Sequence, residues 1–518
     1  PRHATEGQCL WEWQLPGVPA AMMGKQVRQE ALYVVGISLE KRVREDHPLR
    51  RIQRAVDFEF ARDRVAHRYG YNGNVSVDPA VVLKLMFLLF YYEVPSEREL
   101  MRTLPERLDW LWFLGYGLED EVPDHSVLSK ARARWGHAVF REFFVCTIEP
   151  CVAAGLVDGT KVHLDGSLVA ADASNDSVVK GSPARAARLR ALFDREAAKL
   201  EDPEAPSPTP AGKPEEPPAG YEPVNNGLVS TTDPDARVVR KGQSAADLCY
   251  KNHRAVDNAF GVITATQTTP GDVKENGEML GLLAEHERNT GAQVETVVAD
   301  SQYGTVENFR TCAELGIRPH MADLSLTQKG TGRRKGIFPE SKFTYDPATD
   351  TYTCPAGQTL HRRRHRKARR AYEYTAGPKV CGACELRSQC TRSAGGRNLK
   401  RHEDHALIEA ARAEARSRAA KRDRRRRKHL MEGSFADAAN HHGFKRSRWR
   451  RLWRQQIQDY LIAAIQNLRI WLRHGPERTN GVVPMPIGLL SPVFWSFLAL
   501  ALAVRTHQGA PGGHRTLR

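Results

Sequence analysis

The spacing of apolar residues changes near residue 160, and this change limits the folds open to the chain. Before it, residues 24–150 place apolar side chains three and four apart, as in VVLKLMFLLFYYEV, which predicts a helical domain. After it, KVHLDGSLVAADAS at 161–174 combines β-branched residues with alternation, which predicts a strand and a turn. Segments with the strand period and the helix period then alternate. An α/β core is therefore expected after a helical N-terminal domain.

A proline-rich stretch interrupts the second part of the chain, and strands and helices resume after it. Residues 201–220 contain seven prolines and predict a linker or a surface insertion. Residues 248–272 predict a hairpin, which a helix at 277–289 and an apolar run at 294–300 follow. Since the apolar run ends on Asp300, this carboxylate is expected at the end of a strand, where catalytic groups of α/β sheets gather.

The chain carries an excess of positive charge, with 77 Lys and Arg against 61 Asp and Glu and a net charge of +16. This excess favours a polyanionic partner, either nucleic acid or an anionic membrane surface, and charge alone does not choose between them. Nine cysteines in 518 residues are too few for a disulfide scaffold. A reducing cytoplasm is therefore the expected location.

The two ends of the chain are expected to lie outside the folded domains. Residues 1–23 show no secretory signal and are expected to be a non-native or disordered extension. Within the tail at 476–518, residues 482–504 are uncharged and long enough to span a bilayer. Three prolines break that segment, so no membrane partner is expected; the alternatives are a tail packed on the core or sequence beyond the domain.

Three acidic residues are candidates for a metal site: Asp165 in DGSLVAADAS, Asp300 in DSQYG and Glu432 in EGSFADAANHHGF. Two are expected on strands and one on a helix. Divalent cations such as Mg²⁺ prefer anionic oxygen ligands, and two such ions can stabilise the attacking and leaving oxygens of an in-line displacement. The alternative is that these carboxylates cap helices or shape turns, as most strand-end aspartates do.

The phrases around these residues, and their order along the chain, carry a family resemblance. DGSLVAADAS, DSQYG and EGSFADAANHHGFKRSRWR match a DGS/T phrase followed by A-x-A-S, a D-x-x-Y-G phrase and an E-x-x-F phrase before a basic stretch. In these phrases the chain resembles the DDE transposases of bacterial insertion sequences. The resemblance covers residues 27–475 and includes PSERELMRTLPERLDWLWFLGY, similar to the family's helical domain, and YKNHRAVDNAFGVI, similar to its strand pair before the second Asp.

The resemblance implies an α/β fold in which an RNase H-like catalytic core, interrupted by an insertion, follows a helical N-terminal domain. The expected parts are a DNA-binding or dimerisation domain at 24–150, the first part of the catalytic core at 155–320, a cysteine-containing insertion at 338–400, and a basic segment with the last catalytic helices at 401–475. A helix is expected to start near Met431, and a long helix with one apolar stripe after Trp449.

The resemblance also assigns roles to individual residues. It implies that Asp165, Asp300 and Glu432 hold the metal ions, Mg²⁺ or Mn²⁺. The neighbouring carboxylates Asp172, Asp176 and Asp257 are expected to be structural or auxiliary, and Tyr303 and Gly304 to shape the turn after the second strand. One departure is Ala439, because relatives often carry at this position a Lys that could approach a DNA phosphate; its loss puts full activity in question.

Basic residues around Glu432 predict a DNA contact, since cations beside a catalytic residue would lie near the scissile DNA. The alternative is a solvated charged face. Trp449 could stack on an unpaired base or pack in the core. The residues expected to contact DNA, some of which could compensate for Ala439, are Arg424, Arg425, Arg426, Arg427, Lys445, Arg446, Arg448 and Arg450.

Four cysteines, Cys354, Cys381, Cys384 and Cys390, have a spacing typical of zinc knuckles, C-x26-C-x2-C-x5-C. Four thiolates bind Zn²⁺ tetrahedrally, and a metal would hold together a segment that has few aliphatic side chains. The alternative is four reduced thiols without a metal. Some members of the resembling family carry a similar cysteine insertion.

These observations lead to one hypothesis for function and one rival. The hypothesis is a transposase, acting in the bacterial cytoplasm at the nucleoid as a homodimer or higher oligomer, that binds the terminal inverted repeats of its own element, hydrolyses the DNA ends and joins their 3′-hydroxyls to target DNA. The rival is a decayed or domesticated DNA-binding protein without turnover, which Ala439 favours. A membrane-associated protein, a third interpretation, depends only on residues 482–504.

Overall fold

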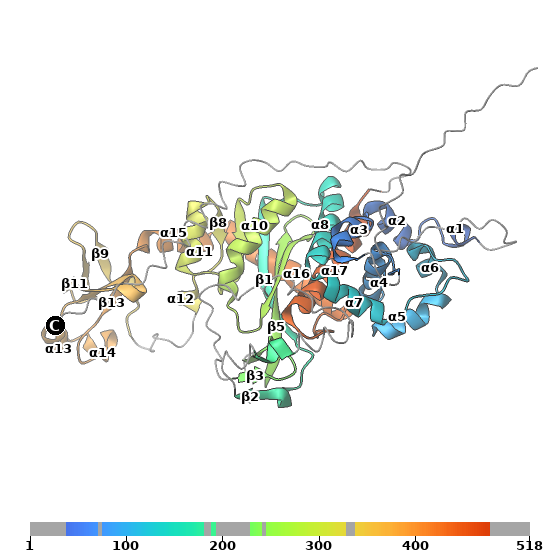
Figure 1. Cartoon of the computed structure of the whole chain (residues 1–518). Helices are drawn as coiled ribbons and strands as arrows, with labels where there is room; N and C mark the ends of the chain where they lie inside the picture. The colour runs from blue at the N-terminus through green and yellow to red at the C-terminus, as the bar shows by residue number, and fades with distance from the viewer. Residues whose placement is uncertain are drawn as a thin grey trace, which may run out of the picture. The chain divides into compact units, whose positions relative to one another are not determined.

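The computed structural model describes residues 38–70, 75–180, 188–192, 228–240, 245–327 and 337–476 (Figure 1). The predicted extension at 1–23, the proline-rich stretch at 201–220 and the apolar segment at 482–504 lie outside these ranges. Within them, no helix is both long and apolar enough to cross a membrane.

Eight α-helices of the described chain precede the first strand, which confirms the predicted helical N-terminal region. Helix α4 is buried from Pro79 to Phe90, as its sequence requires, since it is apolar all round except at Lys84. Ser96 begins α5 by accepting a hydrogen bond from the Glu99 backbone N–H at 3.1 Å. The helices are α1 (Leu39–Arg42), α2 (Pro48–Ala55), α3 (Phe60–Val65), α4 (Pro79–Tyr91), α5 (Glu97–Thr103), α6 (Leu108–Leu114), α7 (Ser126–Trp135) and α8 (Ala138–Ala153).

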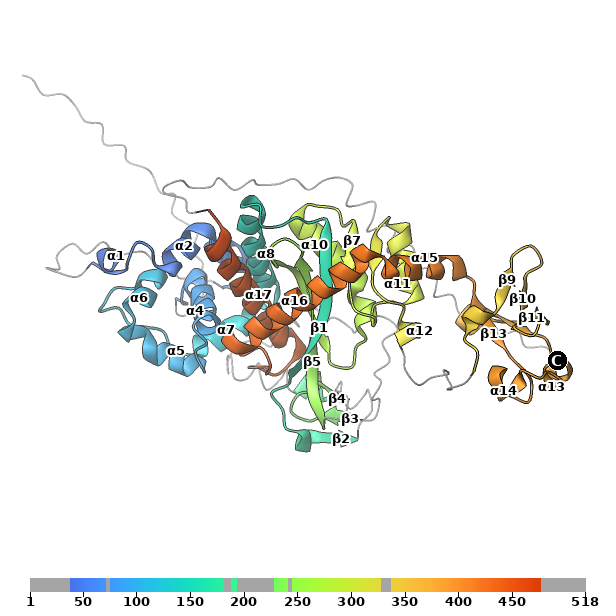
Figure 2. The same cartoon turned by 180° about the vertical axis from the view of Figure 1, so that it is seen from behind.

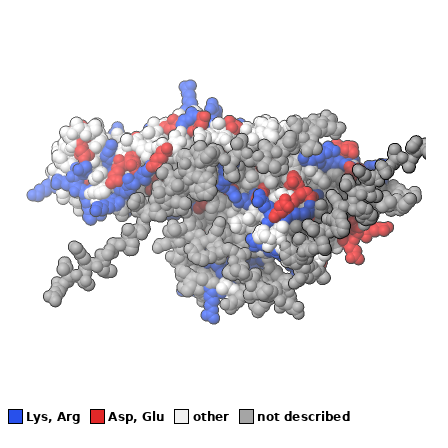
Figure 3. Space-filling model, turned by 45° about the horizontal axis from the view of Figure 1, so that its top comes forward, with Lys and Arg blue, Asp and Glu red and all other residues white. Residues whose placement is uncertain are grey.

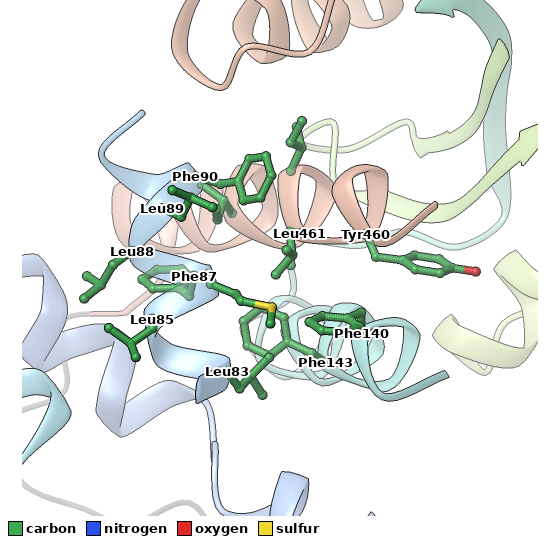
Figure 4. Close-up of a cluster of buried hydrophobic side chains, with 14 of the residues drawn as sticks. Leu83, Leu85, Phe87, Leu88, Leu89, Phe90, Phe140, Phe143, Tyr460 and Leu461 are labelled. Carbon is green, nitrogen blue, oxygen red and sulfur yellow. The ribbon is translucent and has the colours of Figure 1, made fainter. Parts of the chain in front are cut away.

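One apolar cluster joins these helices to the last helix, α17 (Leu452–His474). Figure 4 shows Phe87 and Phe90 of α4 and Phe143 of α8 near Leu461 of α17. α17 also packs on strand β6 (Ile263–Pro270) and so connects the helical region to the sheet. The apolar stripe predicted for this helix is present, because its first four members are buried: Ile457, Leu461, Ile465 and Leu468.

The central sheet has the strand order β4–β5–β1–β7–β8, and β6 pairs with β5. β5 is antiparallel to β4, β6 and β1, whereas β1, β7 and β8 are parallel to one another. Three antiparallel strands followed by two parallel ones form an RNase H-like sheet, so the predicted fold class is confirmed. The remaining strands of the sheet are β1 (Lys161–Ala170), β4 (Arg237–Arg240), β5 (Ala246–Asp257), β7 (Thr296–Val298) and β8 (Arg318–His320); β2 (Val178–Lys180) and β3 (Leu228–Ser230) form a separate ribbon.

The two faces of β1 contact different helices because strand side chains alternate. Val162 and Leu164 belong to an apolar cluster with residues of α10 (Met279–Thr290) and α11 (Val306–Glu314). Asp165 points to the other side and contacts α16 (Arg418–His441), which crosses β1 in Figure 2. The sequence thus places an acidic side chain between the sheet and a strongly basic helix.

The helix predicted to start near Met431 starts 13 residues earlier, so that prediction is wrong about its beginning. Ser417 accepts a hydrogen bond from the Ala420 backbone N–H at 3.0 Å and begins α16. The arginine run is therefore part of the helix, preceded by α15 (His405–Arg416). Arginine has a high helix propensity, but a charged run carries no apolar period from which a helix could be recognised.

The cysteine-containing segment forms a five-stranded antiparallel sheet of its own, with the order β13–β12–β11–β10–β9. Its apolar core contains more aromatic than aliphatic side chains, so the shortage of aliphatic residues does not leave the segment without a core. The core residues are Phe343, Tyr352, Leu360, Tyr374 and Leu399. Its strands are β9 (Thr344–Asp346), β10 (Thr351–Thr353), β11 (Thr359–Arg366), β12 (Ala371–Thr375) and β13 (Leu399–His402); short helices nearby are α12 (Leu324–Thr327), α13 (Pro378–Gly382) and α14 (Arg387–Cys390).

Candidate active site

Asp165 lies in the middle of β1, where it is held by two hydrogen bonds. The Arg427 guanidinium of α16 donates to its Oδ2 at 2.6 Å, and the Gly166 backbone N–H donates to its Oδ1 at 2.9 Å. Burial raises the pKa of Asp165, Arg427 opposes this, and the neighbouring Asp300 raises it further. The carboxylate is therefore partly desolvated and has one cation and one anion beside it.

Asp300 follows β7 and lies next to Asp165, as the strand-end position predicts. The parallel register pairs His163 with Val298, so residues 165 and 300, two positions further along each chain, come side by side. Asp300 accepts a hydrogen bond from the Gln302 backbone N–H at 2.8 Å, which fixes the turn after the strand. Two of the three predicted metal ligands are thus brought together.

Glu432 lies on α16 but on a more exposed side than Arg427. Arg427, Met431 and Phe435 follow one another at steps of four residues and face the core, whereas Glu432 is about 100° further round the helix. Its side chain is 67% exposed, and its ion-pair partner is Lys428, 3.9 Å away on the same helix. The structure does not bring Glu432 into contact with the two aspartates, and its role as a metal ligand stays a prediction.

A carboxylate that the sequence does not single out lies at the same place. Glu275 begins the short 3₁₀-helix η4 (Glu275–Glu278), and a Cβ added to Gly166 would lie 3.1 Å from its Cδ. Burial raises the pKa of Glu275, Lys251 opposes this, and Asp300 and Asp165 raise it further. The loop around Glu275 has no periodic pattern, so only the glycine next to Asp165 hints at a close neighbour.

Tyr303 and Gly304 occupy the turn after Asp300, as predicted. A Cβ at Gly304 would lie 1.9 Å from the Ala322 carbonyl oxygen, so no other residue fits there. The Tyr303 ring is fully buried, and its hydroxyl has no hydrogen-bond partner among the residues that the structure describes. Burial raises the pKa of Tyr303, and three carboxylates raise it further: Glu275, Asp165 and Asp300.

Most of the cations expected to contact DNA also have partners within the protein. Arg426 donates to Asn258 Oδ1 at 2.9 Å, and Arg448 donates to the Val94 carbonyl at 2.7 Å. Arg425 is exposed and has no ion pair or hydrogen bond within the described chain. The other partners are the Ala415 carbonyl for Arg424, Asp165 for Arg427, Ser167 for Lys445, Asp172 for Arg446 and the Asp172 carbonyl for Arg450.

Lys445 reaches the catalytic strand although the position of the family's Lys is taken by Ala439. The segment after α16 pairs with the end of β1, because Ala170 N–H donates to the Lys445 carbonyl at 2.9 Å. The Lys445 ammonium donates to Ser167 Oγ at 3.1 Å, two residues along β1 from Asp165 and on the same face. A cation is therefore present beside the strand that carries the first Asp.

Trp449 is used in packing. Its ring centroid lies 5.7 Å from that of Phe90, and the guanidinium of Arg132 lies 4.0 Å from the ring. Its indole N–H donates to Glu97 Oε1 at 3.1 Å. These contacts to α4, α5 and α7 agree with the alternative that Trp449 packs in the core.

The four cysteines of the insertion lie close to one another. Burial raises the pKa of Cys390, Arg397 opposes this, and Cys354, Cys381 and Cys384 raise it further. All four thiols are free and half-buried, and the Gln358 backbone N–H donates to Cys354 Sγ at 3.3 Å. As they stand, no three or more His, Cys, Asp or Glu side chains of the described residues are placed to hold a metal ion.

An RNase H-like sheet with neighbouring carboxylates on β1 and after β7 is typical of metal-dependent nucleases and DNA strand transferases. Comparison with known families is in agreement. A transposase domain (DUF772) matches residues 37–134, and a transposase DDE domain matches residues 353–471. The chain is a DDE transposase of the insertion-sequence type. A search of curated proteins finds no match.

Proposed function

We propose that this transposase binds the terminal inverted repeats of its element, cleaves the DNA at their ends and joins the freed ends to target DNA. The observation that carries the proposal is the pair of adjacent carboxylates, Asp165 on β1 and Asp300 directly after the parallel strand β7. In the proposed sequence, water first breaks a phosphodiester bond and leaves a 3′-hydroxyl. That hydroxyl then attacks a target phosphate, whose own 3′-oxygen leaves.

Asp165, Asp300 and Glu432 are the proposed ligands of divalent ions, Mg²⁺ or Mn²⁺. The residues present fit such ions, since two adjacent carboxylates repel each other and a buried tyrosine hydroxyl beside them lacks a partner among the described residues. When bound, the ions would supply charge stabilisation to the attacking and leaving oxygens. Arg427 and Lys445, beside β1, are suited to hold a DNA phosphate.

We also propose that Cys354, Cys381, Cys384 and Cys390 bind one structural Zn²⁺. Their mutual proximity supports this, as does the backbone N–H that donates to Cys354 Sγ, a hydrogen bond typical of metal-bound thiolates. The zinc would fix the two short helices α13 and α14 against the small sheet of the insertion. Assembly as a dimer or higher oligomer is proposed because two element ends must be brought together.

The proposal is tested with labelled inverted-repeat DNA, Mg²⁺ and two matched variants. Asp300→Asn should reduce cleavage on the order of 10²-fold or more, because it removes an anionic ligand of the ions that would stabilise the reaction, and should leave binding unchanged. Asp176→Asn, an exposed aspartate outside the site, should cleave normally. Equal loss of binding and cleavage in Asp300→Asn would point to misfolding, and normal cleavage would contradict the proposed site.

A further inference from the structure

Glu275 is a partly buried carboxylate for which the family resemblance assigns no role. Two contacts position it. Its carboxylate lies against the backbone of Gly166, next to Asp165. The backbone carbonyl of the following residue, Asn276, accepts a hydrogen bond from Asn308 Nδ2 at 3.0 Å. The same Asn308 side chain donates to the Tyr303 carbonyl at 2.9 Å. One buried amide thus ties the Glu275 loop to the turn that follows Asp300.

The ion pair with Lys251 does not account for this placement. The Lys251 ammonium lies 3.6 Å from Glu275 Oε1, and it donates a shorter hydrogen bond, 2.9 Å, to the Val273 carbonyl. Lys251 pairs with Glu275 and Arg427 pairs with Asp165, whereas Asp300 forms no ion pair among the described residues. A cation bound among the three carboxylates would neutralise this remaining charge.

The Tyr303 hydroxyl gives an independent indication of a missing ligand. It is fully buried, lies in the field of Glu275, Asp165 and Asp300, and makes no hydrogen bond to any residue in the described ranges. A buried hydroxyl without a protein partner is uncommon and usually bonds to a bound water or ion. A hydrated cation among the three carboxylates would supply that partner.

We propose that Glu275 is a further carboxylate of the divalent-cation site, beside Asp165 and Asp300, and that Tyr303 donates to the water of the bound ion. This inference rests on the proposed function, because it adds a residue to the same site. It gives a reason for Gly166 in the DGS phrase: a Cβ there would lie 3.1 Å from Glu275 Cδ, so a side chain would push the Glu275 carboxylate out of its position. It also adds to Asp165 and Asp300 a carboxylate whose side chain is less exposed than that of Glu432.

The test is titration of the full chain with Mn²⁺ in the absence of DNA, followed by electron paramagnetic resonance of the free ion. Glu275→Gln preserves the shape of the side chain and removes its charge; it should weaken Mn²⁺ binding about tenfold or more. Glu278→Gln is the matched control, since Glu278 is buried in the same 3₁₀-helix but burial alone, with no charged neighbour, raises its pKa. Binding by Glu275→Gln equal to that of the wild type would overturn the inference.

A second measurement on the wild type is independent of how the variant folds. Fe²⁺ bound in place of Mn²⁺, with ascorbate and peroxide, produces radicals that cut the nearby backbone. Fragment ends close to residues 165, 275 and 300 are expected, and the absence of a cut near 275 when the other two occur would overturn the inference.

If Asp300→Asn binds Mn²⁺ and cleaves DNA normally, the proposed function itself fails; if only Glu275→Gln is normal, the proposed function stands without this residue.

Discussion

Asp459 of α17 is a fully buried carboxyl group, and its surroundings are polar. It accepts hydrogen bonds from the Thr268 hydroxyl at 2.6 Å, Asn252 Nδ2 at 3.0 Å and Gln455 Nε2 at 2.9 Å. Burial raises its pKa to about 6, while Thr268 and the buried Arg254 oppose the shift. This group joins the last helix to strands β5 and β6, so its ionisation affects how the core holds together.

We predict that Asp459 makes the protein less stable as the pH rises. Its pKa in the folded chain, about 6, is above the ordinary value of 3.8, so the folded state binds the proton more tightly than the unfolded state does. Its stabilising contribution is therefore complete below the ordinary pKa and is lost as the pH rises through 6. Urea unfolding across this range should show a falling free energy of unfolding, with a smaller fall in Asp459→Asn. An identical pH dependence in the variant would contradict the assignment.

At the scale of single residues, the sequence predicts the position of a residue when the segment around it follows a periodic pattern. Asp165 and Asp300 could be placed because alternation predicts the strand that contains Asp165 and an apolar run predicts the strand that Asp300 follows, and parallel neighbours bring such positions together. Glu275 could not, because it stands in a loop whose position depends on the Asn308 side chain, distant in sequence. Glu432 could be placed on a helix, but which way it faces depends on where that helix packs.

At the scale of the elements, the segment between α16 and α17 packs against the N-terminal helices through Trp449. We predict that Trp449→Ala lowers the free energy of unfolding by about 3 kcal/mol, because the half-buried ring packs on Phe90 and Arg132. Trp449→Phe should lower the free energy of unfolding by less, because it keeps an aromatic ring and loses mainly the hydrogen bond to Glu97. Chemical denaturation of both variants checks this. Unchanged stability together with weaker binding of unpaired DNA ends would instead support base stacking.

The cysteine-containing insertion, residues 338–400, provides a second prediction at this scale. Figure 3 shows Lys and Arg side chains gathered over this part of the chain, with acidic ones among them. Purified protein should contain about one zinc per chain, and Cys384→Ser should lower that content and make the insertion sensitive to protease, because one of four thiolate ligands is lost. Cys146→Ser, in α8, is the control and should keep the metal. Zinc-free protein with a protease-resistant insertion would show that its apolar core is sufficient.

The elements that sequence patterns predict best are those with a clear apolar period. The stripe of α17 and the β5–β6 hairpin are examples, since apolar residues at helix spacing and β-branched runs on either side of a turn mark them in the sequence. The structure buries more than these patterns require: residues 457–468 are buried throughout, and so are most residues of β5 and β6. The first half of α16 was missed because its arginines are exposed or paired with distant groups, such as Asn258. The sheet of the insertion was not recognised either, because β11 buries only Leu360 and otherwise displays charged and polar side chains.

For the whole molecule, the continuous apolar cluster means that the helical region and the catalytic sheet depend on each other. α17 contacts α8, α4 and β6, so the last described helix completes packing that the first ones begin. A chain ending before Leu452 would therefore expose buried surface of both regions. The fold class could be derived from the order of helical and strand-like segments, whereas this mutual dependence could not, because it depends on contacts between residues about 370 positions apart, such as Phe90 and Leu461.

The central claim is that the chain is an active transposase and not a DNA-binding descendant of one. It is tested most directly by strand transfer: labelled inverted-repeat ends with a free 3′-hydroxyl are incubated with the protein, Mg²⁺ and circular target DNA. We predict labelled DNA covalently joined to the target through its 3′ ends with the wild type, and none with Asp165→Asn, which still binds the ends. Wild-type protein that binds the ends and yields no joined product would contradict the account and support the decayed protein.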